Sequence, residues 1–279
     1  MREKYGDEVF SRYFGSRSKV VHLVPGGIVS ARSPPELLQQ EFDADAAGYT
    51  EGVRSNPIEL YLKETSRDRL VEAFRSSGAL LEIGAGTGFE TLPLLSAGHP
   101  VTVVDLSTRM LALLTERARA AGFGEKLTCR VGRLSQLGEA AKEFDTGTIG
   151  GAYSTFGAFN LESDLGTAPT ALARMLRPGA RMIFTTLNRP GAFPVVWEFA
   201  LGNRSGAFRR AGRVLPSGSI RYPLTVFPRN PSYWDRALAP SFRRVATLPV
   251  SVAAPPFESP RLVRWLGRVG GSRARRWDE

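Results

Sequence analysis

The 279-residue chain contains a single cysteine, Cys129, and no long apolar run. One thiol cannot build an intramolecular disulfide framework or a cysteine-based zinc site. Cys129 lies in the apolar segment LTCRV, which favours burial in a strand over thiol chemistry. No apolar run approaches the roughly 20 residues of a membrane-spanning helix, and no hydrophobic region follows the charged N-terminus MREKYGDEVFSRYF. We therefore expect a cytoplasmic protein without a secretory signal or a transmembrane segment.

Acidic residues are scarce in the last third of the chain. From Arg189 onward 16 arginines accompany 5 acids, whereas residues 1–188 carry a net charge of −1. Such asymmetry indicates an anionic partner, a membrane surface or nucleic acid, but an arginine-rich solvated surface has the same composition. Both interpretations stay open. The length and the 42% hydrophobic content suit one decorated α/β domain or two small ones.

The most informative stretch is ALLEIGAGTGFETLPLL, residues 79–95. An apolar run reaches Glu82, glycines follow at 84, 86 and 88, and helix-forming residues then resume. This pattern indicates a strand, a tight turn and a helix. Glycines in such a turn adopt positive φ and let a ligand approach the backbone closely. The helix that follows offers unpaired N–H groups at its start.

The spacing of these glycines excludes two common nucleotide-binding patterns. The dinucleotide pattern G-x-G-x-x-G needs a glycine where the chain has Phe89, and no lysine follows the turn as a phosphate-binding loop requires. Glu82 would also repel a pyrophosphate. The remaining pattern, E-x-G-x-G-x-G, suits a ligand that carries an adenosine but no phosphate.

The segment Glu82–Gly88 resembles motif I of the class I S-adenosylmethionine-dependent methyltransferases, and the β-branched run at residues 100–105 ends in an acid, as the family's second strand does. The resemblance covers about residues 42–252. It implies an α/β fold with a Rossmann-like, doubly wound, mostly parallel sheet, and S-adenosyl-L-methionine as methyl donor, with S-adenosyl-L-homocysteine as product. In the family the acid after strand two binds the ribose hydroxyls, a role that falls on Asp105. An apolar side chain packs on adenine, a role that falls on Met110.

The resemblance places the cofactor against the glycine turn and the loops after the next three strands. The positions expected to contact it are Tyr49, Glu82, Gly84, Ala85, Gly86, Thr87, Gly88, Asp105, Leu106, Met110, Gly132, Arg133, Leu134, Ala152 and Tyr153. Many members bind the adenine amino group with an aspartate where this chain has Arg133, which cannot accept that bond. Backbone groups should then bind the adenine, with Arg133 either stacking on it or turned away.

The loop from Tyr153 to Asn160 should face the methyl group, because ligands of parallel α/β sheets bind outside the carboxyl ends of the strands. The loop lacks the Asn-Pro-Pro-aromatic or Asp-Pro-Pro-aromatic tetrad of relatives that methylate exocyclic amines of bases or glutamine amides. This argues against DNA methylation. Tyr153 and Asn160 are the candidate catalytic residues. Without a histidine or a metal-binding cluster nearby, we expect catalysis by positioning and no metal site.

Local patterns predict the remaining elements. Helices are expected at 33–42, 56–75, 108–121 and 233–238, and strands at 100–105, 127–131, 144–152, 181–187, 220–227 and 242–252. Asn56, followed by a proline and by Glu59, is a helix start. His99 is expected to be a turn residue. Whether the strand at 220–227 completes the sheet edge, or the sheet is one strand short, stays open.

We predict two regions. Residues 1–56 form an N-terminal extension, whose end carries Tyr49 in a segment that resembles the family's cofactor lid; a surface tyrosine in a loop is the alternative. Residues 57–279 form the methyltransferase domain, with a basic tail at 255–279. An insertion at 188–219 resembles the substrate covers of small-molecule methyltransferases, although a dimer interface or shallow membrane contact would explain it equally.

The sequence thus predicts methyl transfer to an oxygen or nitrogen of a small molecule with an apolar part. Two alternatives stay open: a lipid, quinone-like or RNA acceptor held by the basic C-terminal third, and a cofactor-binding partner subunit that has lost its chemistry. Nucleic acid is otherwise not an expected partner. A homodimer and peripheral membrane contact are left open.

Overall fold

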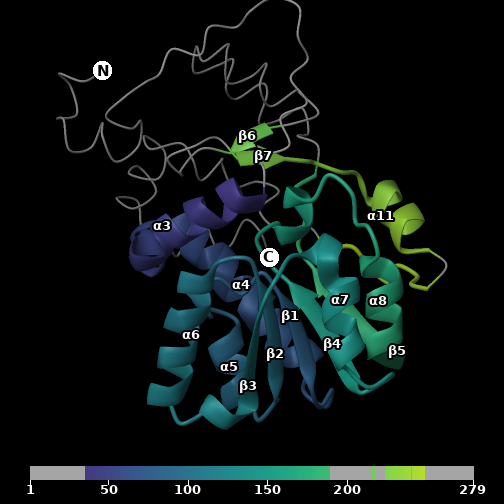
Figure 1. The fold of residues 1–279 in the computed structure, drawn as a ribbon, viewed down its shortest axis with the longest axis horizontal. Coiled ribbons are helices and arrows are strands. Elements are labelled where there is room, and N and C mark those ends of the chain that lie inside the picture. Colours follow the sequence, from purple (N-terminus) through teal and green to yellow (C-terminus); the bar gives the residue numbers. More distant parts are fainter. Residues whose placement is uncertain (1–34, 189–214, 218–223, 240, 249–279) are drawn as a thin grey trace, which may run out of the picture.

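A five-stranded parallel sheet forms the centre of the computed structural model, which describes residues 35–188, 215–217, 224–239 and 241–248 (Figure 1). The strands are β1 (Leu80–Ile83), β2 (Val101–Asp105), β3 (Leu127–Val131), β4 (Ile149–Ser154) and β5 (Leu176–Phe184). Their order is β3-β2-β1-β4-β5, and all four pairings are parallel. The order reverses between β1 and β4, which is where ligands bind in such sheets. The Rossmann-like, doubly wound fold is confirmed.

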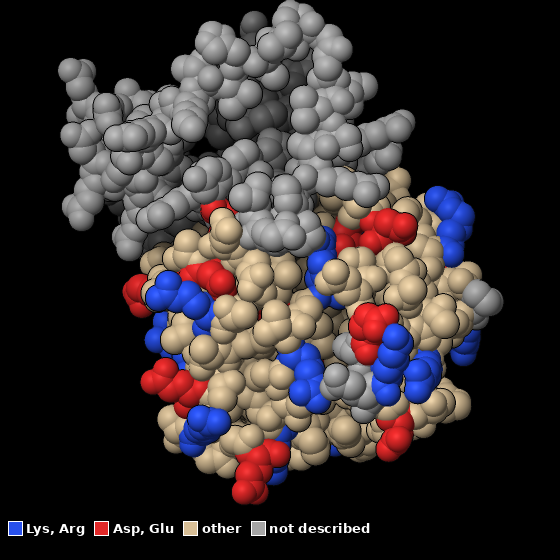
Figure 2. Space-filling view, viewed as in Figure 1, with Lys and Arg blue, Asp and Glu red and all other residues tan. Residues whose placement is uncertain are grey.

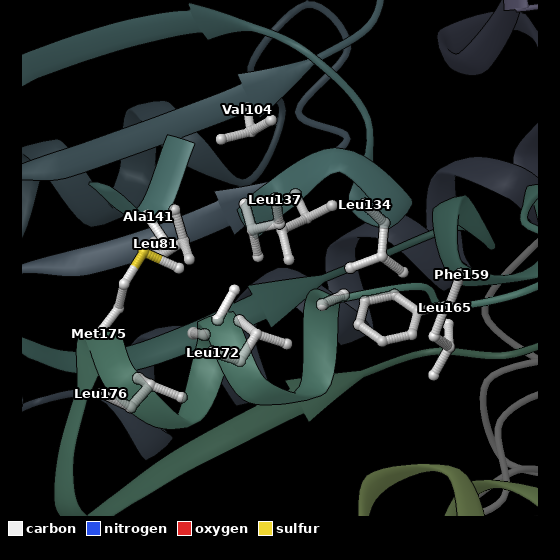
Figure 3. Close-up of a cluster of buried hydrophobic side chains, with 14 of the residues drawn as sticks. Leu81, Val104, Leu134, Leu137, Ala141, Phe159, Leu165, Leu172, Met175 and Leu176 are labelled. Carbon is white, nitrogen blue, oxygen red and sulfur yellow. The ribbon is translucent and has the colours of Figure 1, made fainter. Parts of the chain in front are cut away.

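Helices cover both faces of the sheet. One face carries α4 (Pro57–Ala73), α5 (Thr91–Ser96) and α6 (Thr108–Ala120), and the other carries α7 (Leu137–Ala140), α8 (Ala168–Met175) and α11 (Pro231–Leu238). Short 3-10 turns are η1 (Gly124–Lys126), η2 (Leu134–Gln136), η3 (Ala141–Glu143) and η4 (Ala158–Leu161). Figure 3 shows the second face, where Leu81 of β1 meets Leu137 and Leu172. Because both faces are covered, β1 and β4 are buried throughout.

The turn after β1 requires glycine at two positions. Gly84 and Gly88 have φ values of 77° and 86°, which L-residues with a side chain rarely adopt. A Cβ atom on Gly84 would lie 2.7 Å from the Cβ of Ala158, and one on Gly88 would overlap Leu114. The predicted strand, turn and helix are therefore confirmed, with the turn packed between α6 and the segment after β4.

The N-terminal extension contains a longer helix than predicted. α3 spans Pro35–Ser55, so Tyr49 lies in a helix and the prediction of a helix ending at Phe42 was wrong. The buried residues Leu38, Ala46 and Val53 lie on α3, which packs on α4 and α6 (Figure 1). That burial outweighs the two exposed glycines within the helix, each of which costs about 1 kcal/mol relative to alanine.

The predicted start of α4 is confirmed. The Asn56 side-chain oxygen accepts the backbone N–H of Glu59 at 3.2 Å, and Gly78, with φ 75°, follows the end of the helix. His99 is a turn residue as expected, because its Nδ1 atom bonds the carbonyl oxygen of Gly78 at 2.9 Å. This bond joins the turns that precede β1 and β2.

Two strand boundaries differ from the prediction. β4 begins at Ile149 rather than at residue 144, and it ends at Ser154, so Tyr153 is a strand residue. Within β4, Gly151 passes close to Phe74, just after α4, where a Cβ would lie 2.5 Å from the ring. β5 begins at Leu176, five residues before its predicted start.

The described part of the predicted strand at 220–227 does not join the central sheet. It forms β7 (Leu224–Val226), which pairs antiparallel with β6 (Leu215–Ser217) in a separate two-stranded sheet. Residues 242–248 contain no strand, contrary to prediction, and 249–252 lie outside the described residues. Within the described chain the central sheet therefore stops at β5. At the opposite edge, Cys129 of β3 is half-buried rather than buried, because β3 has a strand neighbour on one side only.

Several predicted segments lie outside the described residues. They are residues 1–34, most of the insertion at 188–219 and the basic tail at 255–279. On the visible face of the described body, acidic and basic side chains are interspersed (Figure 2). This mixture agrees with the near-neutral charge of residues 1–188. In the described part of the chain, every helix is too short or too polar to cross a membrane.

Candidate active site

Asp105 joins the glycine turn to the loop after β2. Its Oδ2 atom accepts the backbone N–H of Gly86 at 2.8 Å, and its Oδ1 atom accepts that of Ser107 at 2.8 Å. Burial raises the pKa of Asp105, and the N–H groups of Ser107 and Gly86 oppose that rise. The backbone N–H of Gly132, after β3, donates to the Asp105 carbonyl oxygen at 2.9 Å. The ends of three strands are thus joined at Asp105, two through its carboxylate and the third through its backbone carbonyl.

Gly86 is the point where distant parts of the chain meet. A Cβ atom there would lie 3.5 Å from the Met110 sulfur and 3.5 Å from the Tyr49 ring. The structure therefore brings together Tyr49, Gly86, Asp105 and Met110, four of the residues that the sequence singled out. We call these four residues the β2 half of the site.

Side-chain hydrogen bonds that the sequence analysis did not predict hold α3 next to the β2 half. Asp43 Oδ1 accepts the Ser107 hydroxyl at 2.6 Å and the Arg109 backbone N–H at 3.0 Å. The hydroxyls of Thr50 and Thr87 are 2.9 Å apart. These partners are 37 to 66 residues apart, so no local pattern signals them.

Glu82 and Tyr153 form a buried pair beneath the glycine turn. They are neighbours on β1 and β4, and the Tyr153 hydroxyl donates to Glu82 Oε2 at 2.8 Å, as does the hydroxyl of Thr91. Glu82 Oε1 has no hydrogen-bond partner among the described residues. Burial, with a contribution from Glu90, raises the pKa of Glu82 to about 8. Burial also raises the pKa of Tyr153. Tyr153 therefore points into the protein rather than toward an acceptor.

A family model described as "Methyltransferase domain" matches residues 81–184, the segment that carries these strands. The ubiquinone biosynthesis O-methyltransferase of Sinorhizobium medicae is 29% identical over 188 residues, 62% of this chain and 66% of that protein. Residues 81–184 therefore resemble a methyltransferase domain, and the chain is similar to methyltransferases over about three fifths of its length.

Other methyltransferases are similar over comparable lengths. The malonyl-[acyl-carrier protein] O-methyltransferase of Erwinia pyrifoliae is 30% identical over 62% of this chain and 59% of its own length. The chain spans about half to two thirds of the length of the curated relatives it matches. Among solved structures, the glycopeptide N-methyltransferase MtfA is 25% identical, with 47% of this chain and 55% of that chain covered and a TM-score of 0.39.

The cofactor of this methyltransferase family is S-adenosylmethionine, and the β2 half suits it. Asp105 has lone pairs left after its two backbone bonds, so it can still accept ribose hydroxyls. Gly86 has no side chain at the point where the Met110 thioether and the Tyr49 ring approach the turn. These are apolar neighbours of the kind that a flat adenine or a thioether chain would contact.

Other predicted contacts divide by where their side chains lie. The Arg133 guanidinium makes two bonds to Glu162, Nε to Oε1 at 2.9 Å and Nη2 to Oε2 at 2.8 Å, so Arg133 is turned toward Glu162. Leu134 and Ala152 pack in the hydrophobic core, and only their backbones are left to face a ligand. Leu106 follows Asp105 in the chain, and Gly132 donates its backbone N–H to the Asp105 carbonyl oxygen.

Asn160 is also used inside the protein. Its Nδ2 atom donates to the carbonyl oxygens of Leu187 at 3.0 Å and Phe227 at 2.8 Å, and its Oδ1 atom accepts the Leu187 N–H at 2.7 Å. The side chain is fully buried. With Tyr153 it forms what we call the β4 half of the site. In this structure both candidate catalytic side chains hold the fold together and neither presents a free polar atom.

Proposed function

We propose that this methyltransferase transfers the methyl group of S-adenosylmethionine to an oxygen or nitrogen of a small molecule that has an apolar part. The observation that carries the proposal is the Asp105 carboxylate bound to the Gly86 backbone, with Tyr49 and Met110 beside it. Two of the curated relatives reported above are named as O-methyltransferases, of ubiquinone biosynthesis and of malonyl-[acyl-carrier protein]. We therefore favour oxygen as the nucleophile.

The described residues contribute positioning. When bound, the cofactor supplies a methyl group on a positively charged sulfur, and the methyl carbon is attacked in line. Asp105 and the Gly86 backbone would hold the adenosine end, while α3 covers the turn and limits water. Orienting the nucleophile against the methyl carbon is worth up to about 7–11 kcal/mol in favourable cases. Because Tyr153 and Asn160 are bonded internally, an acceptor that ionises readily, such as a phenol or a carboxylic acid, suits the site best.

Donor binding is tested by calorimetric titration of S-adenosylmethionine and S-adenosylhomocysteine. Asp105→Ala should raise both dissociation constants about a hundredfold, because the removed carboxylate would bind two hydroxyls. Asp145→Ala, at an exposed position, is the matched control and should bind like the wild type. Thermal unfolding of both variants separates lost binding from lost structure. Failure of well-folded wild type to bind either compound would overturn the proposal.

The acceptor is tested by mass spectrometry after incubation with the donor and separate acceptors. Phenols and carboxylic acids with apolar tails, amines, and a structured RNA form the panel. We expect gain of one methyl group on oxygen of the apolar compounds. Methylation of RNA alone, weakening steeply with salt, would favour the RNA alternative. Donor binding without turnover on any acceptor would favour the partner-subunit alternative.

The remaining sequence predictions stay proposals for this chain. They are a cytoplasmic location, a homodimer or peripheral membrane contact, the lid role of residues 1–56 and the acceptor-covering role of residues 188–219. Liposome sedimentation tests the membrane contact. α3 is the one described part of the lid, and its contacts with Ser107 and Thr87 support that role.

A further inference from the structure

Lys63 is a charged residue in a core position. It lies on α4 with 4% of its side chain exposed, and Ser66 and Leu70 continue the same buried stripe three and seven residues later. Lysine is almost never fully buried unless it has a partner. Neither the glycine motif nor the proposed roles above use this residue. Its presence in the stripe needs a partner that compensates the buried charge.

Three aromatic rings from three parts of the chain surround the Lys63 ammonium. Its Nζ atom is 3.9 Å from the centre of the Phe156 ring, and 5.5 Å from those of Tyr49 and Phe89. Ring faces attract a cation at such distances. Phe156 follows β4 and holds a φ of 54°, a backbone conformation that is uncommon for a residue with a side chain and tends to occur at functional sites. Tyr49 also contacts Gly86, so Lys63 lies at the edge of the β2 half.

Lys63 shares a side-chain hydrogen bond with Tyr49, but the carboxylate beside it does not bond the ammonium directly. Glu90 Oε1 is 3.6 Å from Lys63 Nζ, beyond hydrogen-bond distance, and this buried oxygen has no hydrogen-bond partner among the described residues. Glu82 Oε1 is also buried without a hydrogen-bond partner among the described residues. The Glu90 carboxylate contributes to the raised pKa of Glu82. A buried ion pair stabilises a protein only when its geometry is good and its remaining hydrogen bonds are made. The cluster of Lys63, Glu82 and Glu90 therefore has bonding capacity for a ligand with both charges.

We propose that Lys63 binds the carboxylate of the donor's methionine moiety, with Glu90 and Glu82 facing its α-ammonium group. A zwitterion placed there would give the Lys63 ammonium and the Glu90 carboxylate each an opposite charge, and it would lie against the two orphaned Oε1 atoms of Glu90 and Glu82. Tyr49 links the cluster to Gly86, whose N–H binds Asp105. The two ends of one donor molecule would thus lie on either side of Gly86. This assignment rests on the proposed donor binding.

The experiment removes the carboxylate from the ligand and the ammonium from the protein. Calorimetry measures binding of S-adenosylmethionine, its decarboxylated form and 5′-methylthioadenosine, which lacks the amino-acid moiety. Wild type should bind the decarboxylated form about ten- to a hundredfold more weakly than the intact donor, the range expected for one bond to a charged group. Lys63→Met should bind the intact and decarboxylated forms alike, with its affinity for 5′-methylthioadenosine unchanged.

Two further variants keep the test decisive. Lys126→Met removes an exposed lysine and should retain the wild-type preference for the carboxylate. If Lys63→Met does not fold, because Glu90 is then buried without its partner, Lys63→Met with Glu90→Gln neutralises both groups. Equal weakening of all three compounds by Lys63→Met, or a wild type that does not distinguish the first two, would overturn the assignment. Wild type that binds none of the three would instead overturn the proposed donor site itself.

Discussion

The two halves of the site differ in what their polar side chains do. In the β2 half, Asp105 makes two bonds to backbone N–H groups and keeps lone pairs for a ligand. In the β4 half, Asn160 makes three bonds to backbone groups, and Tyr153 donates to the buried Glu82. The residues proposed to bind the donor thus keep groups available for a ligand, whereas the candidate catalytic residues Tyr153 and Asn160 hold the fold together.

This difference follows from the kind of constraint on each half. Binding one adenosine at a strand end needs a bare turn and a carboxylate, and a short motif can supply both. The position of Asn160 in the β4 half instead depends on two distant segments, because its side chain bonds the backbone of residues 187 and 227. An acceptor surface can change with such returning segments while the donor surface stays the same.

The largest expected effect comes from Asn160. Asn160→Ala would remove the partner of the Leu187 N–H and of the Phe227 carbonyl, each costing about 1–3 kcal/mol, whereas the Leu187 carbonyl would still accept the Arg229 N–H. We expect the free energy of unfolding to fall by about 3 kcal/mol or more, measured by urea denaturation. Affinity of the folded variant for S-adenosylmethionine should stay within about threefold of wild type, because the β2 half is untouched.

The matched control for this variant is Asn230→Ala. Asn230 is exposed before α11 and makes no side-chain capping bond, so its loss should leave stability nearly unchanged. A variant of Asn160 that kept wild-type stability and lost turnover would contradict the contrast between the two halves, since Asn160 would then act in catalysis.

The second prediction concerns pH and the Glu82 carboxyl group, which lies beneath the glycine turn and accepts the Tyr153 hydroxyl. Burial raises the pKa of Glu82 from 4.5 to about 8, so between these values the folded protein keeps a proton that the unfolded chain releases. The stability associated with this group is therefore fully present below pH 4.5 and is lost as pH rises toward 8. The slope for one proton is at most about 1.4 kcal/mol per pH unit. Urea denaturation of Glu82→Gln at several pH values should give a flatter dependence.

Glu139→Gln is the control for Glu82, because Glu139 is exposed on α7 and pairs only with the exposed Lys142. Its unfolding should keep the wild-type pH dependence. If Glu82→Gln also kept that dependence, the Glu82 carboxyl would titrate at an ordinary pKa in the folded protein. The description of Glu82 as a buried carboxyl that stays protonated over this range would then fail.

The sequence predicted the β2 half far better than the β4 half. Three glycines, Asp105 and Met110 are close together in the chain or end adjacent strands, so their meeting follows from the topology of parallel sheets. Lys63 and Asp43 were missed because their partners come from other elements. The strand expected at 242–252 contains β-branched residues, and their preference for strands depends on neighbouring strands. Residues 242–248 have none.

The smallest expected effect tests whether α3 belongs to the donor half. Asp43 caps α6 from another helix, accepting the Ser107 hydroxyl and the Arg109 N–H, so Asp43→Ala should cost about 1 kcal/mol of stability, as loss of a helix cap does. If α3 acts as the lid, hydrogen exchange should accelerate in α3 and the affinity for S-adenosylmethionine should fall severalfold, because Tyr49 lies on the same helix. Glu51→Ala, exposed on α3, should change neither. Faster exchange with unchanged affinity would show that α3 stabilises α6 without covering the donor, and the β2 half would then consist of the sheet edge and the glycine turn alone.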